Sequence, residues 1–201
     1  MITVAALFVD PKGCYAGLPG VDLWDEQRDA RLYDEEHPVV AHPPCSTWCQ
    51  LAAVNEARYG HRVGDDGGCF ESALASVRRC GGVLEHPAYT HAWKRFGLRK
   101  PHRPGGWLPT RCGGHVCHVE QHSYGHPARK ATWLYAHGVD LPQLLWGSTG
   151  TPTAWVGWMR NHGAGEGRKR VGKRAAAATP PAFRDALLAM ARSARSERVK
   201  P

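Results

Sequence analysis

Cys45 is the residue of this chain best placed to act as a nucleophile. It ends the segment His-Pro-Pro-Cys at 42–45, which follows a short apolar run at 38–41 that we interpret as a buried strand. Because the two prolines lack an N–H and fix φ, the strand ends there and leaves Cys45 at its carboxyl end. In open α/β sheets ligands bind at this rim, and a thiol beside a histidine can have its pKa lowered. The alternative is a small buried residue behind a turn, as free cysteines usually are.

Glu85 lies at a second strand end of the same kind. The segment 81–87, Gly-Gly-Val-Leu-Glu-His-Pro, is an apolar run that ends in a carboxylate and a proline. Before it, apolar residues recur at the spacing of one helix face: Phe70, Ala73, Leu74 and Val77. A strand, a helix and a strand in this order indicate a right-handed crossover between parallel strands. We therefore expect Cys45 and Glu85 at the same rim of the sheet.

Three motifs follow one another in an order that resembles the DNA cytosine-5 methyltransferase family. They are Pro-Pro-Cys at 43–45, Leu-Glu-x-Pro at 84–87, and Gln121 followed by the basic pair Arg129 and Lys130. A fourth motif, Ala-Ala-Thr-Pro-Pro-Ala-Phe at 177–183, is similar to the segment before the family's last helix. The chain also looks like a group of short phage and prophage proteins that have no assigned activity.

The resemblance implies that Cys45 and Glu85 modify carbon 5 of a pyrimidine. C5 of cytosine is unreactive until a thiolate adds at C6, which makes C5 enamine-like, and protonation of N3 assists that addition. Cys45 fits the role of the nucleophile, and Glu85 fits the role of the acid at N3 and N4. The role of Glu85 requires a raised pKa, which burial at a strand end would supply.

The same resemblance implies a set of substrate-binding residues in the two loops and on a later strand. They are His42, Pro44, Ser46, Trp48, Gln121, Arg129 and Lys130. The family's separate sequence-reading domain has no counterpart in this chain. We therefore expect one of three cases: low sequence specificity, a single-stranded DNA substrate, or a free pyrimidine nucleotide as the substrate.

S-adenosyl-L-methionine is the cofactor that the family implies, at the rim formed by the first two strands. The residues expected to hold it are Asp10, Tyr15, Asp22, Trp24 and Asp25. The family's Phe-x-Gly-x-Gly-Gly loop is absent, and Phe-Val-Asp-Pro-Lys-Gly-Cys-Tyr stands at 8–15 in its place. The acidic residues between 22 and 36 can also be read as a solvated helix face.

The formal charge of +8 and the pI near 9.3 favour a polyanionic partner such as DNA. Two irregular insertions, 90–111 and 147–174, carry the basic residues expected to contact nucleic acid: Lys94, Arg95, Arg99, Lys100, Arg168, Lys169 and Arg170. Such stretches suit phosphate contact with base stacking, and they equally suit a surface loop or a soluble linker.

We expect one α/β domain over 1–192, with a Rossmann-like, mostly parallel sheet, flanking helices and a disordered tail at 193–201. The resemblance implies a reduced form of the methyltransferase fold. Seven cysteines without regular spacing indicate reduced thiols in the cytoplasm. Residues 1–9 read as a strand rather than a signal peptide, and no apolar run is long enough to span a membrane.

Zinc at Cys112, Cys117, His118 and His122 is not expected, because strand alternation would divide these ligands between two faces. The oligomeric state is left open.

Three functions remain open from the sequence. The first is an enzyme that modifies pyrimidine C5, with methyl transfer to DNA cytosine as its main form. The second is a nucleic-acid-binding module that has lost the cofactor loop, for example a phage anti-restriction decoy. The third keeps the chemistry but acts on a nucleotide with another one-carbon donor.

Overall fold

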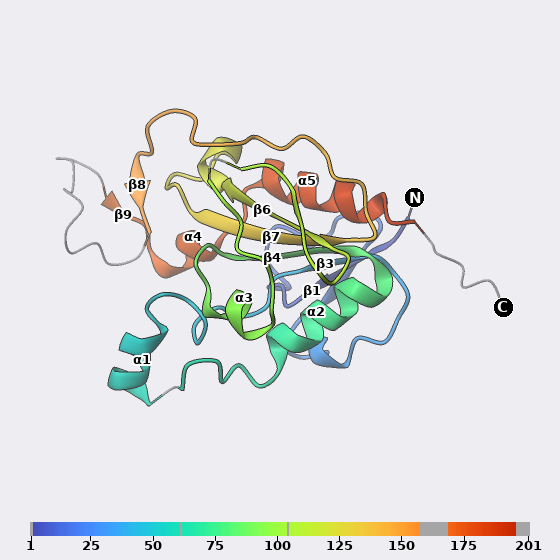
Figure 1. Cartoon of the computed structure of the whole chain (residues 1–201), viewed down its shortest axis with the longest axis horizontal. Coiled ribbons are helices and arrows are strands. Elements are labelled where there is room, and N and C mark those ends of the chain that lie inside the picture. Colours follow the sequence, from blue (N-terminus) through green and yellow to red (C-terminus); the bar gives the residue numbers. More distant parts are fainter. Residues whose placement is uncertain (1, 61, 104, 157–168, 196–201) are drawn as a thin grey trace.

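The computed structural model describes residues 2–60, 62–103, 105–156 and 169–195 as a seven-stranded sheet with helices on both faces (Figure 1). The strands of this sheet are β1 (Val4–Leu7), β2 (Val21–Trp24), β3 (Val39–Ala41), β4 (Gly82–Pro87), β5 (Leu108–Pro109), β6 (His115–Glu120) and β7 (Ala131–His137). A separate pair consists of β8 (Ala154–Trp155) and β9 (Lys169–Arg170). The helices are α1 (Ala52–Tyr59), α2 (Cys69–Cys80), α3 (His91–Arg95), α4 (Lys173–Ala177) and α5 (Pro181–Arg192), with short 3-10 helices η1 (Ala30–Leu32) and η2 (Gln121–Tyr124).

The sheet is mixed, with the order β2-β1-β3-β4-β7-β6-β5. Its first half pairs in parallel, as predicted for β3 and β4. Its second half pairs antiparallel, because β7 returns between β4 and β6 and β5 folds back on β6. The prediction of a mostly parallel sheet is therefore wrong for the half of the sheet beyond β4. A β7 that is reached through a short connection from β6 can pair only antiparallel to it, since a parallel return needs a crossover of about a dozen residues.

Two hydrophobic layers cover the sheet, one on each face. The helical spacing predicted for Phe70 to Val77 is confirmed, because these residues of α2 pack on the face that carries Leu84. On the other face, α5 buries Phe183, Leu187 and Met190 against residues such as Val83. Alternation along β4 therefore directs Leu84 toward α2 and its neighbour Glu85 toward α5.

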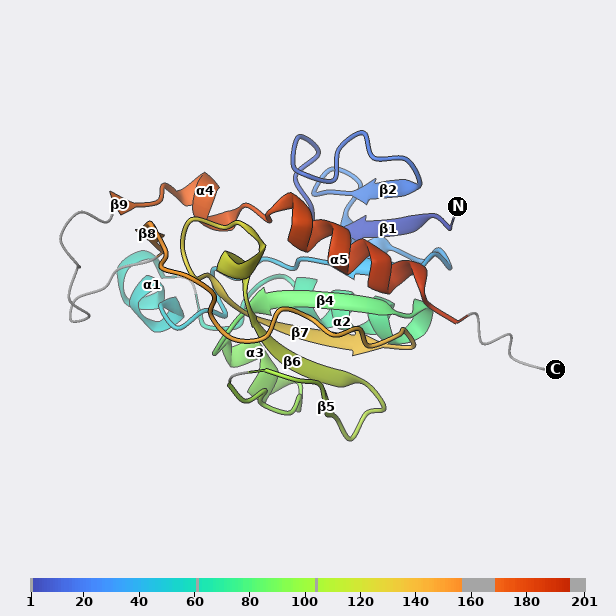
Figure 2. The ribbon, with the colours of Figure 1, turned by 90° about the horizontal axis from the view of Figure 1, so that it is seen from above.

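The strand order reverses between β1 and β3, since the chain leaves β1 to one side for β2 and returns to the other side for β3. Loops that leave such a reversal point diverge, and ligands of open α/β sheets bind in the crevice between them. The arrows of β1, β2 and β4 point toward the end of the molecule at which α1, α4, β8 and β9 lie (Figure 2). The predicted catalytic residues follow β3 and end β4 at this same rim.

The two irregular insertions are more ordered than predicted. The first contains α3 and β5, and the described part of the second contains β8, β9 and the start of α4. Arg168 lies outside the described residues. No helix in the described ranges has the length and apolar character needed to cross a membrane.

Candidate active site

Five segments of the chain bring polar side chains to the rim at the carboxyl ends of β1, β3 and β4. The register of the parallel pair β3 and β4 places Ala41 opposite Leu84, so the next residues, His42 and Glu85, lie side by side. Because β7 runs antiparallel to β4, its first residues return to this same rim. The contact between His42 and Glu85, which are far apart in the sequence, therefore follows from the register of β3 and β4.

Glu85 is the centre of a buried hydrogen-bond network. Its Oε2 lies 3.0 Å from Nδ1 of His42, and its Oε1 accepts from Nε2 of Gln121 at 3.1 Å. The same Gln121 nitrogen lies 3.0 Å from Oγ1 of Thr132 on β7. The other ring nitrogen of His42, Nε2, lies 2.8 Å from the hydroxyl of Tyr15 in the loop after β1. A continuous chain of contacts thus runs from Tyr15 through His42 to Glu85.

This network holds Glu85 ionised. Burial would raise the pKa of Glu85, but the hydrogen bond with His42 and the charge of Lys130 outweigh it and lower the pKa to about 2. The prediction of a raised pKa is therefore wrong for the protein without substrate. Burial also raises the pKa of Tyr15 well above its ordinary value, so Tyr15 keeps its proton and donates to His42, whose Nδ1–H in turn donates to Glu85.

Cys45 is half-buried in the turn after β3. Burial is the main reason that its pKa rises to about 11, and the negative charge of Glu85 raises it further. The nearby charge of Lys130 acts in the opposite direction. The prediction of a lowered pKa for Cys45 is thus wrong for the resting protein, in which the thiol keeps its proton. The mutual electrostatic influence of Cys45, Glu85 and Lys130 nevertheless places all three around one region of the rim.

Lys130 joins this rim to the segment that leads into α5. Its ammonium donates to the carbonyl oxygens of Ala177 and Ala178, at 3.0 and 2.7 Å, at the end of α4. Burial lowers the pKa of Lys130, while the charges of Glu85, Cys45 and Cys14 raise it. His126 adds a second link to α4, because its Nε2 lies 3.0 Å from the carbonyl oxygen of Ala175. Together, Lys130 and His126 hold α4 against the rim.

The other predicted substrate-binding residues are spread more widely. Pro44 and Ser46 are exposed on the turn that carries Cys45, and Arg129 is exposed beside Lys130. Trp48 is buried, and its indole nitrogen donates to Asp66 at 2.8 Å. Of the predicted set, His42 and Gln121 contact Glu85, and the charge of Lys130 acts on its pKa.

The predicted cofactor residues lie within β2 and in the segments that follow β1 and β2, but several of their polar groups already have partners in the chain. Both carboxylate oxygens of Asp22 are engaged, one by Arg28 at 2.7 Å and one by the indole of Trp24 at 2.7 Å. Trp24 also lies under the Arg28 guanidinium, 4.0 Å from the ring centre. Tyr15 belongs to the Glu85 network, which the sequence did not indicate. Asp22, Trp24 and Tyr15 therefore do not fit the role of adenosylmethionine ligands as they stand.

Asp10 and Asp25 fit that role better. One oxygen of each accepts a backbone N–H, from Lys12 and Arg28 respectively. Within the described part of the chain, the second oxygen of each makes no hydrogen bond, and both residues are at least partly exposed. These two carboxylates remain able to accept the hydroxyls of a ribose.

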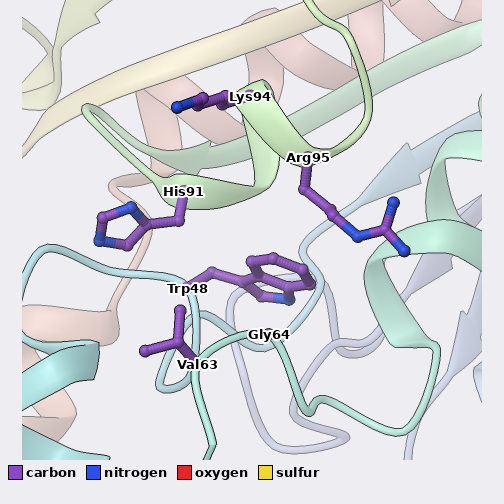
Figure 3. A pocket seen from close by; sticks show the side chains of 6 residues that line it. All are labelled: Trp48, Val63, Gly64, His91, Lys94 and Arg95. Carbon is purple, nitrogen blue, oxygen red and sulfur yellow. The ribbon is translucent and has the colours of Figure 1, made fainter.

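The predicted nucleic-acid-binding residues of the first insertion, Lys94, Arg95, Arg99 and Lys100, are all exposed. Lys94 and Arg95 line a pocket together with Trp48, Val63, Gly64 and His91 (Figure 3). Arg99 bonds a backbone carbonyl at Pro109, and Lys100 lies over the ring of Tyr89. In the second insertion, Lys169 and Arg170 form β9, beside β8.

The four residues considered as zinc ligands lie apart. Cys117 on β6 faces α5, whereas His118 on the same strand faces the opposite layer, where it accepts from the indole of Trp133 at 3.2 Å. Cys112 lies beside Thr110 and Tyr135, and His122 faces the carbonyl oxygen of His126. No three histidine, cysteine or acidic residues of the described ranges are grouped so that they could hold a metal ion.

Tyr15 and Thr132 are the members of the site whose place in it sequence reasoning missed. A hydroxyl within the apolar run at 131–135 was a usable signal for Thr132, since a buried polar group in a strand needs a partner. No comparable signal exists for Tyr15, which meets His42 only because β1 and β3 are neighbours in the sheet. In comparisons with known proteins, no family model, no curated protein and no solved structure matches this chain.

Proposed function

We propose that this protein modifies carbon 5 of a pyrimidine, with DNA cytosine as the substrate. In this proposal Cys45 is the nucleophile and Glu85 binds N3 and N4 of the base. The observation that supports it most is the register of β3 and β4, which brings a thiol and a carboxylate to neighbouring strand ends beside the point where the strand order reverses.

The pKa directions suggest how the base itself would activate Cys45. In the resting state the charge of Glu85 opposes formation of a thiolate. A pyrimidine whose N3 shares a proton with Glu85 neutralises that charge, which lowers the pKa of Cys45. The sulfur then adds to C6, the thiol proton is released, and N3 gains a proton, so that the net change is addition of S–H to the ring. His42 and Tyr15 hold the carboxylate in position and supply a path for the proton.

Gln121 is the residue suited to recognise the exocyclic group of the base. Its side chain is fully buried, and its Nε2 is used by Glu85 and Thr132. Its Oε1 has no hydrogen-bond partner among the residues that the structure describes. An unpaired acceptor of this kind costs free energy until a donor arrives, and the N4 amino group of cytosine is such a donor.

The proposed methyl donor is S-adenosyl-L-methionine, which when bound would supply the methyl group transferred to C5. Asp25 and Asp10 are the residues that would accept its ribose hydroxyls. Isothermal calorimetry with the full chain tests this part of the proposal: binding that Asp25→Asn weakens supports it, and no heat of binding contradicts it.

The function itself is tested by trapping with a single-stranded oligonucleotide that contains 5-fluorocytosine, in the presence of S-adenosyl-L-methionine. Fluorine at C5 cannot leave as a proton would, so the enzyme stays attached to the DNA after transfer. The expected result is a covalent complex with the wild-type chain and none with Cys45→Ser. A chain that binds the oligonucleotide equally well with serine at 45, and never forms the complex, would not be an enzyme of this type.

That outcome would instead support a nucleic-acid-binding module without chemistry. Two observations favour this second candidate: the thiol keeps its proton in the resting protein, and Asp22 is already engaged by Arg28. A reaction at the level of a free nucleotide with another one-carbon donor would be recognised by adduct formation with 5-fluorodeoxycytidine monophosphate in place of the oligonucleotide.

A further inference from the structure

A pocket lies beside the turn that carries Cys45, on the side away from Glu85. Its walls are Trp48 from that turn, Val63 and Gly64 from the loop before α2, and His91, Lys94 and Arg95 from α3. The pocket has a volume of about 520 Å³, within the range of small-ligand sites. Figure 3 shows the Trp48 indole between His91 and Arg95, with Val63 beside it.

The charge of the pocket suits an anion. Three of its six lining residues are basic or histidine, and none is acidic. Among the described residues, neither Lys94 nor Arg95 forms an ion pair with a carboxylate. The carboxylate of Asp66, which lies near the pocket, accepts hydrogen bonds from the indole of Trp48 and from the backbone N–H groups of Gly68 and Phe70.

The backbone of the turn at 45–48 is hydrogen-bonded to the segments that line this pocket. The N–H of Trp48 donates to the carbonyl oxygen of Cys45 at 3.1 Å, which places the two Cα atoms within about 7 Å. Trp48 in turn accepts from the N–H of His91 at 2.8 Å, and Thr47 accepts from the N–H of Gly64 at 2.9 Å. A ligand that fixes α3 and the loop at 63–64 therefore also fixes the position of Cys45.

The pocket and the Glu85 network lie on opposite faces of the sheet. Trp48 packs in the layer that contains α2, whereas Tyr15, on the side of Glu85, packs in the layer that contains α5. The turn from 45 to 48 thus passes over the rim from one layer to the other. A nucleic-acid strand that lies across this rim would present one nucleotide to Glu85 and its neighbour to the pocket.

We infer that this pocket binds the nucleotide next to the target base, with the phosphates on its two sides on Lys94 and Arg95 and its base against the exposed side chains of His91 and Val63. The inference rests on the proposed function and gives it a substrate class: a polynucleotide strand rather than a free nucleotide. Cationic side chains beside an aromatic surface are the usual means of binding single strands without reading their sequence. Occupation of the pocket would also order the turn that holds the nucleophile.

The binding test uses a fluorescently labelled 12-nucleotide DNA strand and measures anisotropy at several salt concentrations. The double variant Lys94→Ala/Arg95→Ala should bind more weakly, and the slope of log K against log salt should fall in magnitude by about 1.4, because two phosphate contacts are lost. The control is Arg111→Ala/Arg195→Ala, which removes the same charge from exposed residues outside the pocket. An equal change of slope in both double variants would overturn the inference. A matching RNA strand shows whether the pocket accepts either sugar.

The second measurement separates this inference from the proposed function. The rate of covalent trapping is compared for 5-fluorocytosine in the 12-nucleotide strand and for 5-fluorodeoxycytidine monophosphate. We expect Lys94→Ala/Arg95→Ala to slow trapping by the strand at least tenfold, a larger factor than for any trapping by the mononucleotide. Equal trapping of strand and mononucleotide by the wild-type chain contradicts the inference alone. No trapping of either, with the salt slope still dependent on Lys94 and Arg95, contradicts the proposed function alone.

Discussion

Cys45 and Glu85 influence each other's ionisation, and this coupling is the chemical property on which the proposed site depends. Glu85 is kept as a carboxylate by His42 and Lys130, and its charge in turn helps to keep Cys45 as a thiol. The position of both residues at strand ends could be predicted from the sequence. Their protonation could not, because His42 contacts Glu85 across 43 positions of the chain and Lys130 comes from the loop before β7.

A first prediction concerns the reactivity of Cys45. In Glu85→Gln the negative charge is gone, so the pKa of Cys45 should fall below about 11 and alkylation by iodoacetamide should begin at lower pH. Mass spectrometry of the Cys45 peptide measures the extent of alkylation at this residue alone. This matters because Cys112 also reacts: burial raises its pKa, but hydrogen bonds that include one with Thr110 outweigh burial and lower the pKa to about 7. The exposed Glu71→Gln is the matched control. An unchanged pH midpoint for the Cys45 peptide in Glu85→Gln would show that the two groups are not coupled.

A second prediction concerns stability in acid. The pKa of Glu85 is about 2 in the folded protein and 4.5 ordinarily, so the folded state gains about 3 kcal/mol from this group above pH 4.5 and loses it as the pH falls toward 2. Glu85→Gln should therefore show a smaller loss of unfolding free energy than the wild-type chain between pH 4.5 and 2, measured by urea unfolding. Glu71→Gln should behave like the wild-type chain. The same acid loss in all three proteins would mean that Glu85 is not held ionised.

A third prediction concerns His86, which should affect the free energy of unfolding at higher pH than Glu85 does. It points away from Glu85 into the layer of Phe70 and Trp93, where burial lowers its pKa to about 4 from 6.5. Because a buried neutral histidine must not gain a proton, the folded state loses stability as the pH falls from 6.5 to 4. His86→Gln should reduce the pH dependence of unfolding in that range, and His118, whose pKa is also lowered by burial, should account for part of what is left. An unchanged dependence between pH 6.5 and 4 in this variant would assign it to groups other than His86.

Among the elements, the pair β3 and β4 determines the geometry of the site, since its register sets His42 beside Glu85. Gly82 in this pair has a φ of +141°, which would direct a Cβ at the backbone of Val39. Helices α2 and α5 were predictable because their apolar spacing is regular over twelve residues each. The antiparallel half was not, because the place of β7 between β4 and β6 is a choice between distant partners that local periodicity does not encode.

A fourth prediction concerns the backbone at Gly82. A Cβ at Gly82 would overlap the carbonyl oxygen of Val39, so Gly82→Ala should destabilise the fold by about 3 kcal/mol or more. Gly60→Ala is the control, because Gly60 also has a positive φ, +72°, but no atom lies within 4 Å of its Cβ position, and about 1 kcal/mol is expected there. Urea unfolding measures both. Equal losses in the two variants would show that the β3–β4 contact is not tight.

In the molecule as a whole, the functional features lie at one rim, where the carboxyl ends of four parallel strands meet the first residues of β7. This rim carries the Glu85 network on the α5 side and the basic pocket of Trp48, Lys94 and Arg95 on the α2 side. The excess of basic residues was readable from composition, but their distribution was not, since Lys94 reaches the Cys45 turn only through the packing of α3. The proposed reaction on one base of a bound strand requires this arrangement.

The central claim, that a thiol and a carboxylate act together on one pyrimidine ring, is tested most directly by hydrogen exchange at C5 of cytosine in D2O. Addition of Cys45 at C6 makes C5 exchange its hydrogen with solvent, and this requires no methyl donor. We predict that the wild-type chain incorporates one deuterium into each target cytosine of a single-stranded oligonucleotide, that Glu85→Gln does so much more slowly and that Cys45→Ser does not. Mass spectrometry of the digested DNA gives the result. No deuterium with the wild-type chain, or the same amount with Cys45→Ser, would contradict the claim.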